Sequence, residues 1–286
     1  MTATCDSVTR VLGFWSLAFA LALATAARHL DDRVVGAGLA AQAANIEPAD
    51  VPAPRTDLNS QTAHAELIAK TRQGHIDIYF VGDSITRRWG ALDYPQFLAN
   101  WRQNFYGWNA ANFGWGGDRT QNILWRLQNG ELDGLNPKII VIQAGTNNVG
   151  ATPGDAAKMS DIVRGIKALI DVCRSKVPQA TIVLTAIFPR NDNRAVLPEI
   201  ARINRAIAQF ADGRTVRFVD ITDKLADSDG TLHDGISPDG LHLTIKGYQI
   251  WADALTPIFN QLLGPPAVVD RAPPATGDPS ARPKER

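Results

Sequence analysis

The chain has 286 residues and no formal net charge at pH 7, with 29 Lys plus Arg against 29 Asp plus Glu. This balance excludes a general nucleic-acid binder, which needs a basic excess to release counterions, and a protein that binds membranes through charge. A hydrophobic share of 45% is enough for a large core, and a charged share of 20% excludes a wholly disordered chain. The 2 cysteines, Cys5 and Cys173, exclude a disulfide framework or a cysteine-based zinc site.

The N-terminus has the pattern of a secretory signal peptide. An apolar run at Val11–Ala27 follows Arg10, and small residues come at Ala24–Ala26 and again at Ala41–Ala43. The run is shorter than the roughly 20 residues of a membrane-spanning helix, so an uncleaved anchor is the less favoured interpretation. We expect residues 1–43 to be a signal peptide and leader, and the chain to be exported to the periplasm or the extracellular space, without stable membrane insertion after cleavage.

Two further segments lack the pattern of a folded core. Residues 44–61 contain three prolines and are interpreted as a linker. Residues 265–286 are rich in Pro, Ala and charged residues, without apolar periodicity. We predict that they form a disordered tail, because such a segment buries too little apolar surface to offset the entropy of ordering. The folded domain is therefore expected over residues 62–264.

Five apolar, β-rich runs in this domain are predicted to be strands. They cover residues 76–81, 110–114, 138–144, 181–188 and 216–221. Apolar residues recur at helical spacing between the runs, most clearly at Met159–Cys173, where Thr152 is the expected N-cap, and again at Ile200–Phe210 and Ile250–Leu262. Alternating strands and helices predict an α/β fold with a doubly wound, mainly parallel five-stranded sheet.

Four short polar motifs lie where such a sheet binds its ligands, beyond the C-terminal ends of the strands. They are Gly82-Asp83-Ser84 after the first run, Gly116-Gly117-Asp118 after the second, Gly145-Thr146-Asn147-Asn148 after the third, and Asp239-Gly240-Leu241-His242 before the last helix. Each motif alone is typical of an ordinary turn or helix cap. Together, at one crevice, they favour an esterase site.

The residue types in these motifs have the chemistry of acyl transfer. The Ser84 hydroxyl faces the crevice as a possible nucleophile, and a carboxylate at Asp239 can orient the imidazole of His242 as a general base. Glycine at position 117 lets a backbone N–H approach a substrate oxygen, and the Asn147 carboxamide can donate a hydrogen bond to an oxyanion.

The motifs resemble the four conserved blocks of the GDSL or SGNH hydrolases. The resemblance covers most of residues 76–263 and rests on Gly82-Asp83-Ser84, Gly117, Asn147 and Asp239-x-x-His242. The segment 112–132, followed by PKIIVIQAGTNNVG, is similar to the catalytic subunits of intracellular platelet-activating-factor acetylhydrolase. Secreted bacterial relatives in this branch include carbohydrate acetyl esterases.

This resemblance implies a flavodoxin-like, three-layer α/β/α sandwich. It implies that Ser84 is the nucleophile, His242 the base and Asp239 its orienting acid. It also implies an oxyanion hole formed by the backbone N–H groups of Ser84 and Gly117 and by the Asn147 side chain. No metal or organic cofactor is expected.

Residues beside the motifs have structural as well as functional interpretations. Asp83 either organises the loops or caps the helix that follows, and Asp118 is expected to hold the second loop in place. Trp115 either lines the substrate pocket or packs inside the loop. Arg87 and Arg88 are interpreted as solvated or packing positions.

The leading hypothesis is an exported serine esterase that removes short acyl groups, in particular acetyl groups, from a small-molecule or glycan ester. The first alternative is a lysophospholipase or a platelet-activating-factor-like acetylhydrolase. The second is an acyltransferase, in which a sugar hydroxyl replaces water. The third is a non-catalytic binding module, against which the presence of the complete residue set argues.

Overall fold

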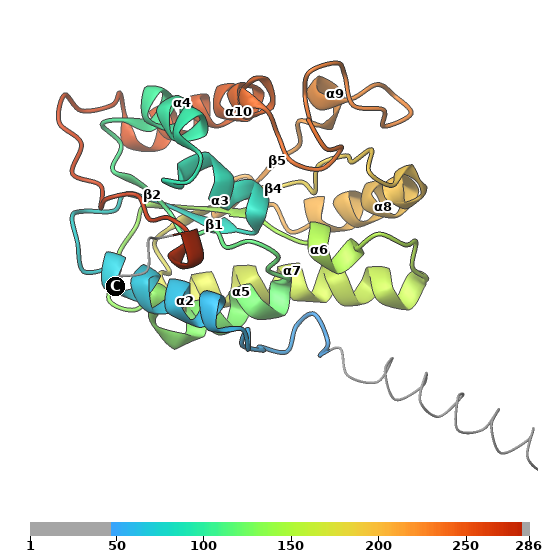
Figure 1. Cartoon of the computed structure of the whole chain (residues 1–286), viewed down its shortest axis with the longest axis horizontal. Coiled ribbons are helices and arrows are strands. Elements are labelled where there is room, and N and C mark those ends of the chain that lie inside the picture. The colour runs from blue at the N-terminus through green and yellow to red at the C-terminus, as the bar shows by residue number, and fades with distance from the viewer. Residues whose placement is uncertain (1–46, 282–286) are drawn as a thin grey trace, which may run out of the picture. The chain divides into compact units, whose positions relative to one another are not determined.

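The computed structural model describes residues 47–281, so the predicted signal peptide and leader lie outside the described residues (Figure 1). Within residues 47–281, no helix is long and apolar enough to cross a membrane. The elements are, in chain order, α2 (Leu58–Lys70), β1 (Ile78–Gly82), α3 (Ser84–Gly90), α4 (Pro95–Phe105), β2 (Ala110–Asn112), α5 (Thr120–Arg126), η1 (Leu127–Glu131), β3 (Ile139–Gln143), α6 (Thr146–Val149), α7 (Ala156–Lys176), β4 (Thr181–Thr185), η2 (Arg194–Val196), α8 (Leu197–Ala208), β5 (Val216–Val219), α9 (Thr222–Leu225), α10 (Ile245–Leu263) and η3 (Pro279–Ala281).

The strands form one parallel sheet in the order β2-β1-β3-β4-β5. The chain passes from β1 to β2 on one side, then returns across β1 to β3 and continues in the opposite direction. In doubly wound folds ligands bind at such a reversal, beyond the C-terminal ends of the strands, which here are those of β1 and β3. The predicted parallel, doubly wound five-stranded sheet is confirmed.

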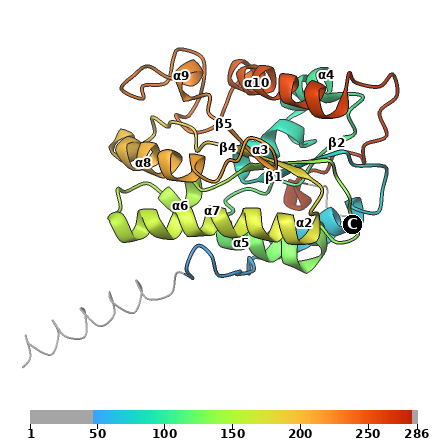
Figure 2. The same cartoon turned by 180° about the vertical axis from the view of Figure 1, so that it is seen from behind.

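Alternate strand residues face the two sides of the sheet, and both sides are covered by helices. Tyr79 and Val81 belong to the core beneath α2, α5, α7 and α8, while Ile78 and Phe80 pack beneath α3, α4, α9 and α10. The two opposite views show α4, α9 and α10 above the strands and α2, α5 and α7 below them (Figures 1 and 2). The structure thus confirms the predicted three-layer α/β/α sandwich.

Helix α7 begins three residues later than its predicted cap implies. Asp155, not Thr152, is the N-cap, and its side chain accepts a hydrogen bond from the Lys158 N–H at 2.9 Å. Thr152 lies in the preceding loop, where the Gly154 N–H donates to Glu199. The loop is therefore held by α8 rather than wound into α7.

Residues 47–57 are not the free linker that their prolines predict, and α2 begins inside the range assigned to it. The Ala53 N–H donates to the Gln121 carbonyl at 3.0 Å, and the Thr120 hydroxyl donates to the Ala49 carbonyl at 2.7 Å. Asp57 caps α2 by accepting the Ser60 N–H. The segment is ordered by hydrogen-bond partners on α5, which leave no periodic signal in its own sequence.

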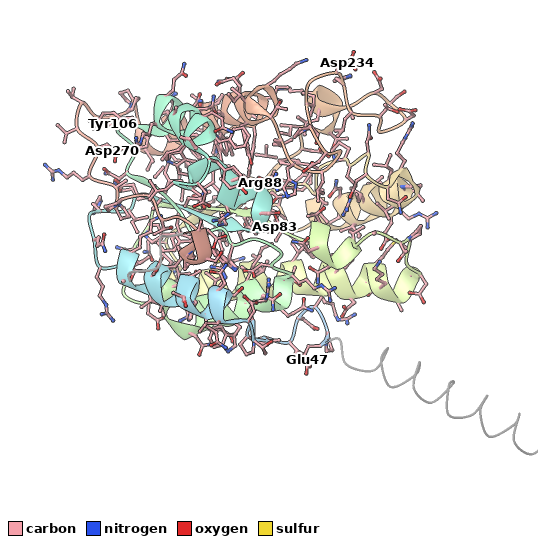
Figure 3. The ribbon with its side chains drawn as sticks, viewed as in Figure 1. Glu47, Asp83, Arg88, Tyr106, Asp234 and Asp270 are labelled. Atoms are coloured by element: carbon pink, nitrogen blue, oxygen red, sulfur yellow. The ribbon has the colours of Figure 1, made fainter. Side chains whose placement is uncertain are left out.

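Residues 265–281 are not the disordered tail that their composition predicts. The segment runs along the body, and Asp270 lies beside the loop after α4, near Tyr106 (Figure 3). Its hydrogen bonds include those of Ala267 N–H to Gly107 O (2.9 Å), His75 N–H to Arg271 O (2.7 Å), Leu92 N–H to Thr276 O (3.0 Å) and Asn59 Nδ2 to Asp278 (2.9 Å). Hydrogen bonds to backbone and side-chain groups on the rest of the chain order the segment and compensate for its weak apolar burial.

Truncation after Gly264 is expected to lower the free energy of unfolding by about 2–4 kcal/mol, because each hydrogen bond lost from residues 265–281 contributes about 0.5–1.5 kcal/mol. Urea unfolding of this truncated chain, compared with a chain that ends at Ala281, measures the difference. Equal unfolding midpoints for the two chains would show that the segment adds nothing to stability.

Candidate active site

Ser84 lies where β1 passes into α3, at the C-terminal edge of the sheet. Asp83 caps α3, because its Oδ1 accepts the Ile85 N–H at 2.9 Å. The cap fixes the turn that carries the half-buried Ser84 side chain. Asp83 and Arg88, labelled near the centre of the molecule, mark this part of the chain (Figure 3).

A hydrogen-bonded relay joins Ser84 to the loop before α10. Ser84 Oγ lies 2.9 Å from His242 Nε2, and His242 Nδ1 lies 2.7 Å from Asp239 Oδ2. The other Asp239 oxygen accepts the backbone N–H groups of Leu241 and His242 at 3.0 and 2.8 Å. A carboxylate at Nδ1 favours the tautomer with its proton there, which leaves Nε2 to accept the Ser84 proton.

The other predicted site residues come from the loops after β2 and β3. Gly117 is exposed and has a φ of 76°, a left-handed conformation that favours glycine. Asn147 lies in α6, and its Nδ2 donates to the Asp118 carbonyl at 2.8 Å. The Trp115 N–H donates to the Gly82 carbonyl at 3.0 Å. These bonds tie the three loops to one another at the same edge of the sheet.

Comparison with known proteins identifies the family. Residues 80–250, more than half of the chain, match the GDSL-like lipase/acylhydrolase family. The chain belongs to this family. It is therefore a carboxylic ester hydrolase, and the predicted membership of the GDSL/SGNH superfamily is confirmed.

Three relatives of this GDSL hydrolase illustrate the match. Human platelet-activating factor acetylhydrolase IB subunit alpha1 is 33% identical over 222 residues, which span 76% of this chain and 91% of that protein. The rat alpha2 subunit is 31% identical over 222 residues, which span 76% and 92%. The solved structure of a GDSL-like lipase from Bacteroides thetaiotaomicron has the same fold, with a TM-score of 0.58, 19% identity and coverage of 72% of this chain and 100% of that one.

The environment of His242 favours its neutral form. Burial lowers the pKa of the imidazole, the hydrogen bond that Nδ1 donates to Asp239 opposes this effect, and the positive charge of Arg88 lowers the pKa further. The pKa of His242 therefore lies below its ordinary value. Arg88 Nη1 is 3.7 Å from Asp239 Oδ2. Arg88 follows Ser84 by one helical turn, so its guanidinium contacts the relay rather than being only solvated. The sequence feature that could have indicated this contact is a basic residue four positions, or one helical turn, after the proposed nucleophile.

Two buried carboxyl groups lie behind the reactive loops of the GDSL hydrolase. Burial raises the pKa of Asp83 to about 7 and that of Asp118 to about 6. Asp83 Oδ2 has no hydrogen-bond partner among the described residues, whereas Asp118 Oδ2 accepts from Arg126 Nε at 2.8 Å. The contacts give Asp83 the capping role and hold Asp118 at the base of the second loop.

Arg126 on α5 is a functional neighbour that the sequence reasoning missed. Its guanidinium pairs with Asp118 and Glu131 and donates to the Phe113 carbonyl at 3.0 Å. Burial opposes the charge of Arg126, but Glu131 and Asp118 raise its pKa above its ordinary value. Arg126 therefore stays charged and anchors the loop that carries Gly117. Its position in an ordinary helical stretch offered no signal in the sequence.

The contacts of Trp115 are those of a packing residue. Its side chain is buried, its Nε1 donates to Ser60 Oγ at 2.8 Å, and the Arg87 guanidinium lies 4.9 Å from the ring centroid. None of these contacts reaches Ser84 or His242, so the structure favours packing over the substrate-lining interpretation.

The part of the chain that the structure describes has no candidate metal-binding site. Residues 47–281 contain no group of three or more His, Cys, Asp or Glu side chains that could hold a metal ion. Cys173 is fully buried in α7, and burial raises the pKa of its thiol to about 12, so it is a core residue.

Proposed function

We propose that this GDSL hydrolase removes short acyl groups, in particular acetyl groups, from carbohydrate esters. Ser84 is the nucleophile, His242 the general base and Asp239 the residue that orients it. The observation that carries the proposal is the continuous relay from Ser84 Oγ to His242 Nε2 (2.9 Å) and from His242 Nδ1 to Asp239 (2.7 Å).

The reaction proceeds in two steps. Ser84 Oγ attacks the ester carbonyl as His242 Nε2 takes the hydroxyl proton, and His242 then protonates the leaving alcohol. The N–H groups of Ser84 and Gly117 and the Asn147 carboxamide hold the negative charge on the carbonyl oxygen. Water, activated by the same imidazole, releases the acyl group from Ser84.

A short acyl group and a polar alcohol fit the surroundings of the relay. Three cavities in residues 47–281 are lined by residues other than Ser84, Asp239 and His242. The charges that act on His242 are those of Arg88, Asp192 and Asp239. Such groups suit the hydroxyls of a sugar better than an alkyl chain.

A phospholipid acetyl ester is the second candidate substrate. The curated relatives are named platelet-activating factor acetylhydrolases. Ile245, three residues after His242, is also 46% exposed and offers an apolar contact beside the relay. Both candidates share the acetyl group and differ in the alcohol.

Purified protein is expected to hydrolyse p-nitrophenyl acetate at least about tenfold faster, in kcat/KM, than the octanoate, because each added methylene meets a site built for a short acyl group. Release of acetate from acetylated xylan oligosaccharides is expected to exceed release from an acetylated ether phospholipid. Preference for octanoate or for the phospholipid would reject the carbohydrate proposal. If an added sugar acceptor becomes acylated instead of free acetate being released, the acyltransferase alternative would replace the hydrolase proposal.

The acid limb of the pH profile of kcat/KM is expected below the ordinary histidine pKa of about 6.5. Protonated His242 cannot accept the Ser84 proton, so activity falls as the pH falls through the lowered pKa. Replacement of Arg88 by Gln removes a positive charge and is expected to move the limb to higher pH, whereas Arg88→Lys is expected to leave it in place. If Arg88→Gln does not shift the acid limb, the limb reports the titration of another group, such as Asp83.

We also propose that the chain is exported, with cleavage within residues 1–43. N-terminal sequencing of the protein recovered from a cell's periplasm or medium tests this proposal. An intact N-terminus in the cytoplasmic fraction would reject it.

A further inference from the structure

The loop at residues 116–118 contains a peptide unit between two glycines whose orientation must be fixed by contacts from outside the loop. In the proposed function, the Gly117 N–H is aimed at the carbonyl oxygen of the substrate. This N–H belongs to the peptide unit that joins Gly116 to Gly117. Neither residue has a Cβ, so rotation of this peptide plane meets little steric resistance. A planar trans peptide points its C=O and N–H in opposite directions, so a rotation would turn the N–H away from the site.

Arg55 binds the opposite end of this peptide unit. Arg55 Nη1 donates to the Gly116 carbonyl at 3.1 Å and lies 3.5 Å from Asp118 Oδ1. The guanidinium also lies over Gly117, since a Cβ built there would be 3.2 Å from Nη1. With the Gly116 carbonyl held by Arg55, the Gly117 N–H must point the other way.

The guanidinium is itself held in place from the opposite side. Asp57 accepts from Arg55 Nε at 3.2 Å and lies 3.0 Å from Nη2. The same carboxylate caps α2 through the Ser60 N–H at 2.8 Å, and its hydrogen bonds keep the pKa of Asp57 below the ordinary value. The segment that carries Arg55 is fixed by the bond between Ala53 N–H and Gln121 O. A continuous set of contacts therefore leads from α2 and α5 to the Gly116 carbonyl.

From this arrangement we infer that Arg55 is a positioning residue for catalysis, which fixes the direction of the Gly117 N–H. A charged donor on the carbonyl also polarises the peptide and strengthens its N–H as a hydrogen-bond donor. The inference rests on the proposed function, because the oxyanion is its object. It assigns a catalytic purpose to the segment before α2, outside the residues 80–250 that define the family match.

Kinetics with p-nitrophenyl acetate test the effect on turnover. Loss of a complete oxyanion donor lowers kcat by about 10²–10³-fold, so Arg55→Ala, which only frees the peptide, is expected to lower kcat by about 10–100-fold with little change in KM. Arg55→Lys cannot bind Asp57 and the Gly116 carbonyl at the same time, so its kcat is expected to lie between those of the wild type and Arg55→Ala. Arg72→Ala, an exposed arginine after α2, is the matched control and is expected to match the wild type. A lower kcat with an unchanged thermal unfolding temperature supports the positioning role of Arg55. An unchanged kcat, or an increase in KM alone, overturns the inference.

Backbone NMR decides the same inference without turnover. In the full chain with Arg55→Ala, the Gly117 amide is expected to show microsecond-to-millisecond exchange broadening that is absent from the wild type and from Arg72→Ala. A sharp, unshifted Gly117 amide in Arg55→Ala overturns the inference. If the wild type lacks Ser84-dependent turnover, the proposed function fails, while the state of the Gly117 amide still reports whether Arg55 holds the peptide.

Discussion

Replacement of Ser84 by Ala is expected to lower ester turnover by about 10⁴-fold or more, the loss typical of removing the nucleophile from a catalytic triad. No second nucleophile takes over in the proposed mechanism, since the relay ends at Ser84 Oγ, 2.9 Å from His242 Nε2. The loss is expected in kcat, because the hydroxyl reacts rather than binds the substrate. Steady-state kinetics on p-nitrophenyl acetate measure it.

The variant is expected to keep the fold, because Ser84 Oγ is on the edge of the sheet and the cap of α3 is made by Asp83. Circular dichroism and thermal unfolding serve as the check. Replacement of the exposed Ser228 by Ala, in the loop after α9, is a matched serine control that is expected to leave turnover unchanged. Residual activity of Ser84→Ala close to that of the wild type would remove Ser84 from the reaction.

Replacement of Arg126 by Met is expected to lower the free energy of unfolding by about 3–5 kcal/mol, because it removes the buried guanidinium that pairs with two buried carboxylates. Asp118 and Glu131 are both fully buried, and Arg126 is paired with each of them. Because the missing charge raises the pKa of Asp118 beyond about 6, the deficit is expected to grow as the pH rises above that value. Urea unfolding at about pH 5 and about pH 8 measures both effects.

An exposed arginine provides the control for this experiment. Arg164 pairs with Asp161 and Asp50 on the surface, so Arg164→Met is expected to cost less than about 1 kcal/mol. Equal losses for the two variants, or a deficit for Arg126→Met that shrinks at high pH, would contradict the buried-charge explanation.

The sheet could be predicted because its strands are buried on both faces and therefore read as continuous apolar runs. The run at residues 138–144 contains β3, which spans Ile139–Gln143. The sequence also predicted that the segments carrying Ser84, Gly117 and Asn147 follow three strands at the same edge of the sheet, since the C-terminal ends of parallel strands meet there. Local patterns and the topology rule were enough for these features.

The two segments that flank the predicted domain could not be predicted in this way. Residues 47–57 and 265–281 have no periodic apolar face. Both are ordered by hydrogen bonds to groups distant in the chain, such as the backbone groups of Gln121 and Gly107. Such partners appear only after the body has folded. Arg55 was missed for the same reason, because its contact with Gly116 joins residues far apart in the chain.

Reaction of the full chain with a serine-directed organophosphate, followed by peptide mass spectrometry, tests the proposed nucleophile most directly. The relay predicts a single covalent adduct on Ser84, no adduct on the Ser84→Ala variant, and much slower labelling when His242 is replaced by Ala. An adduct on another residue, or none on the folded wild type, would contradict the assignment of Ser84 as the activated nucleophile.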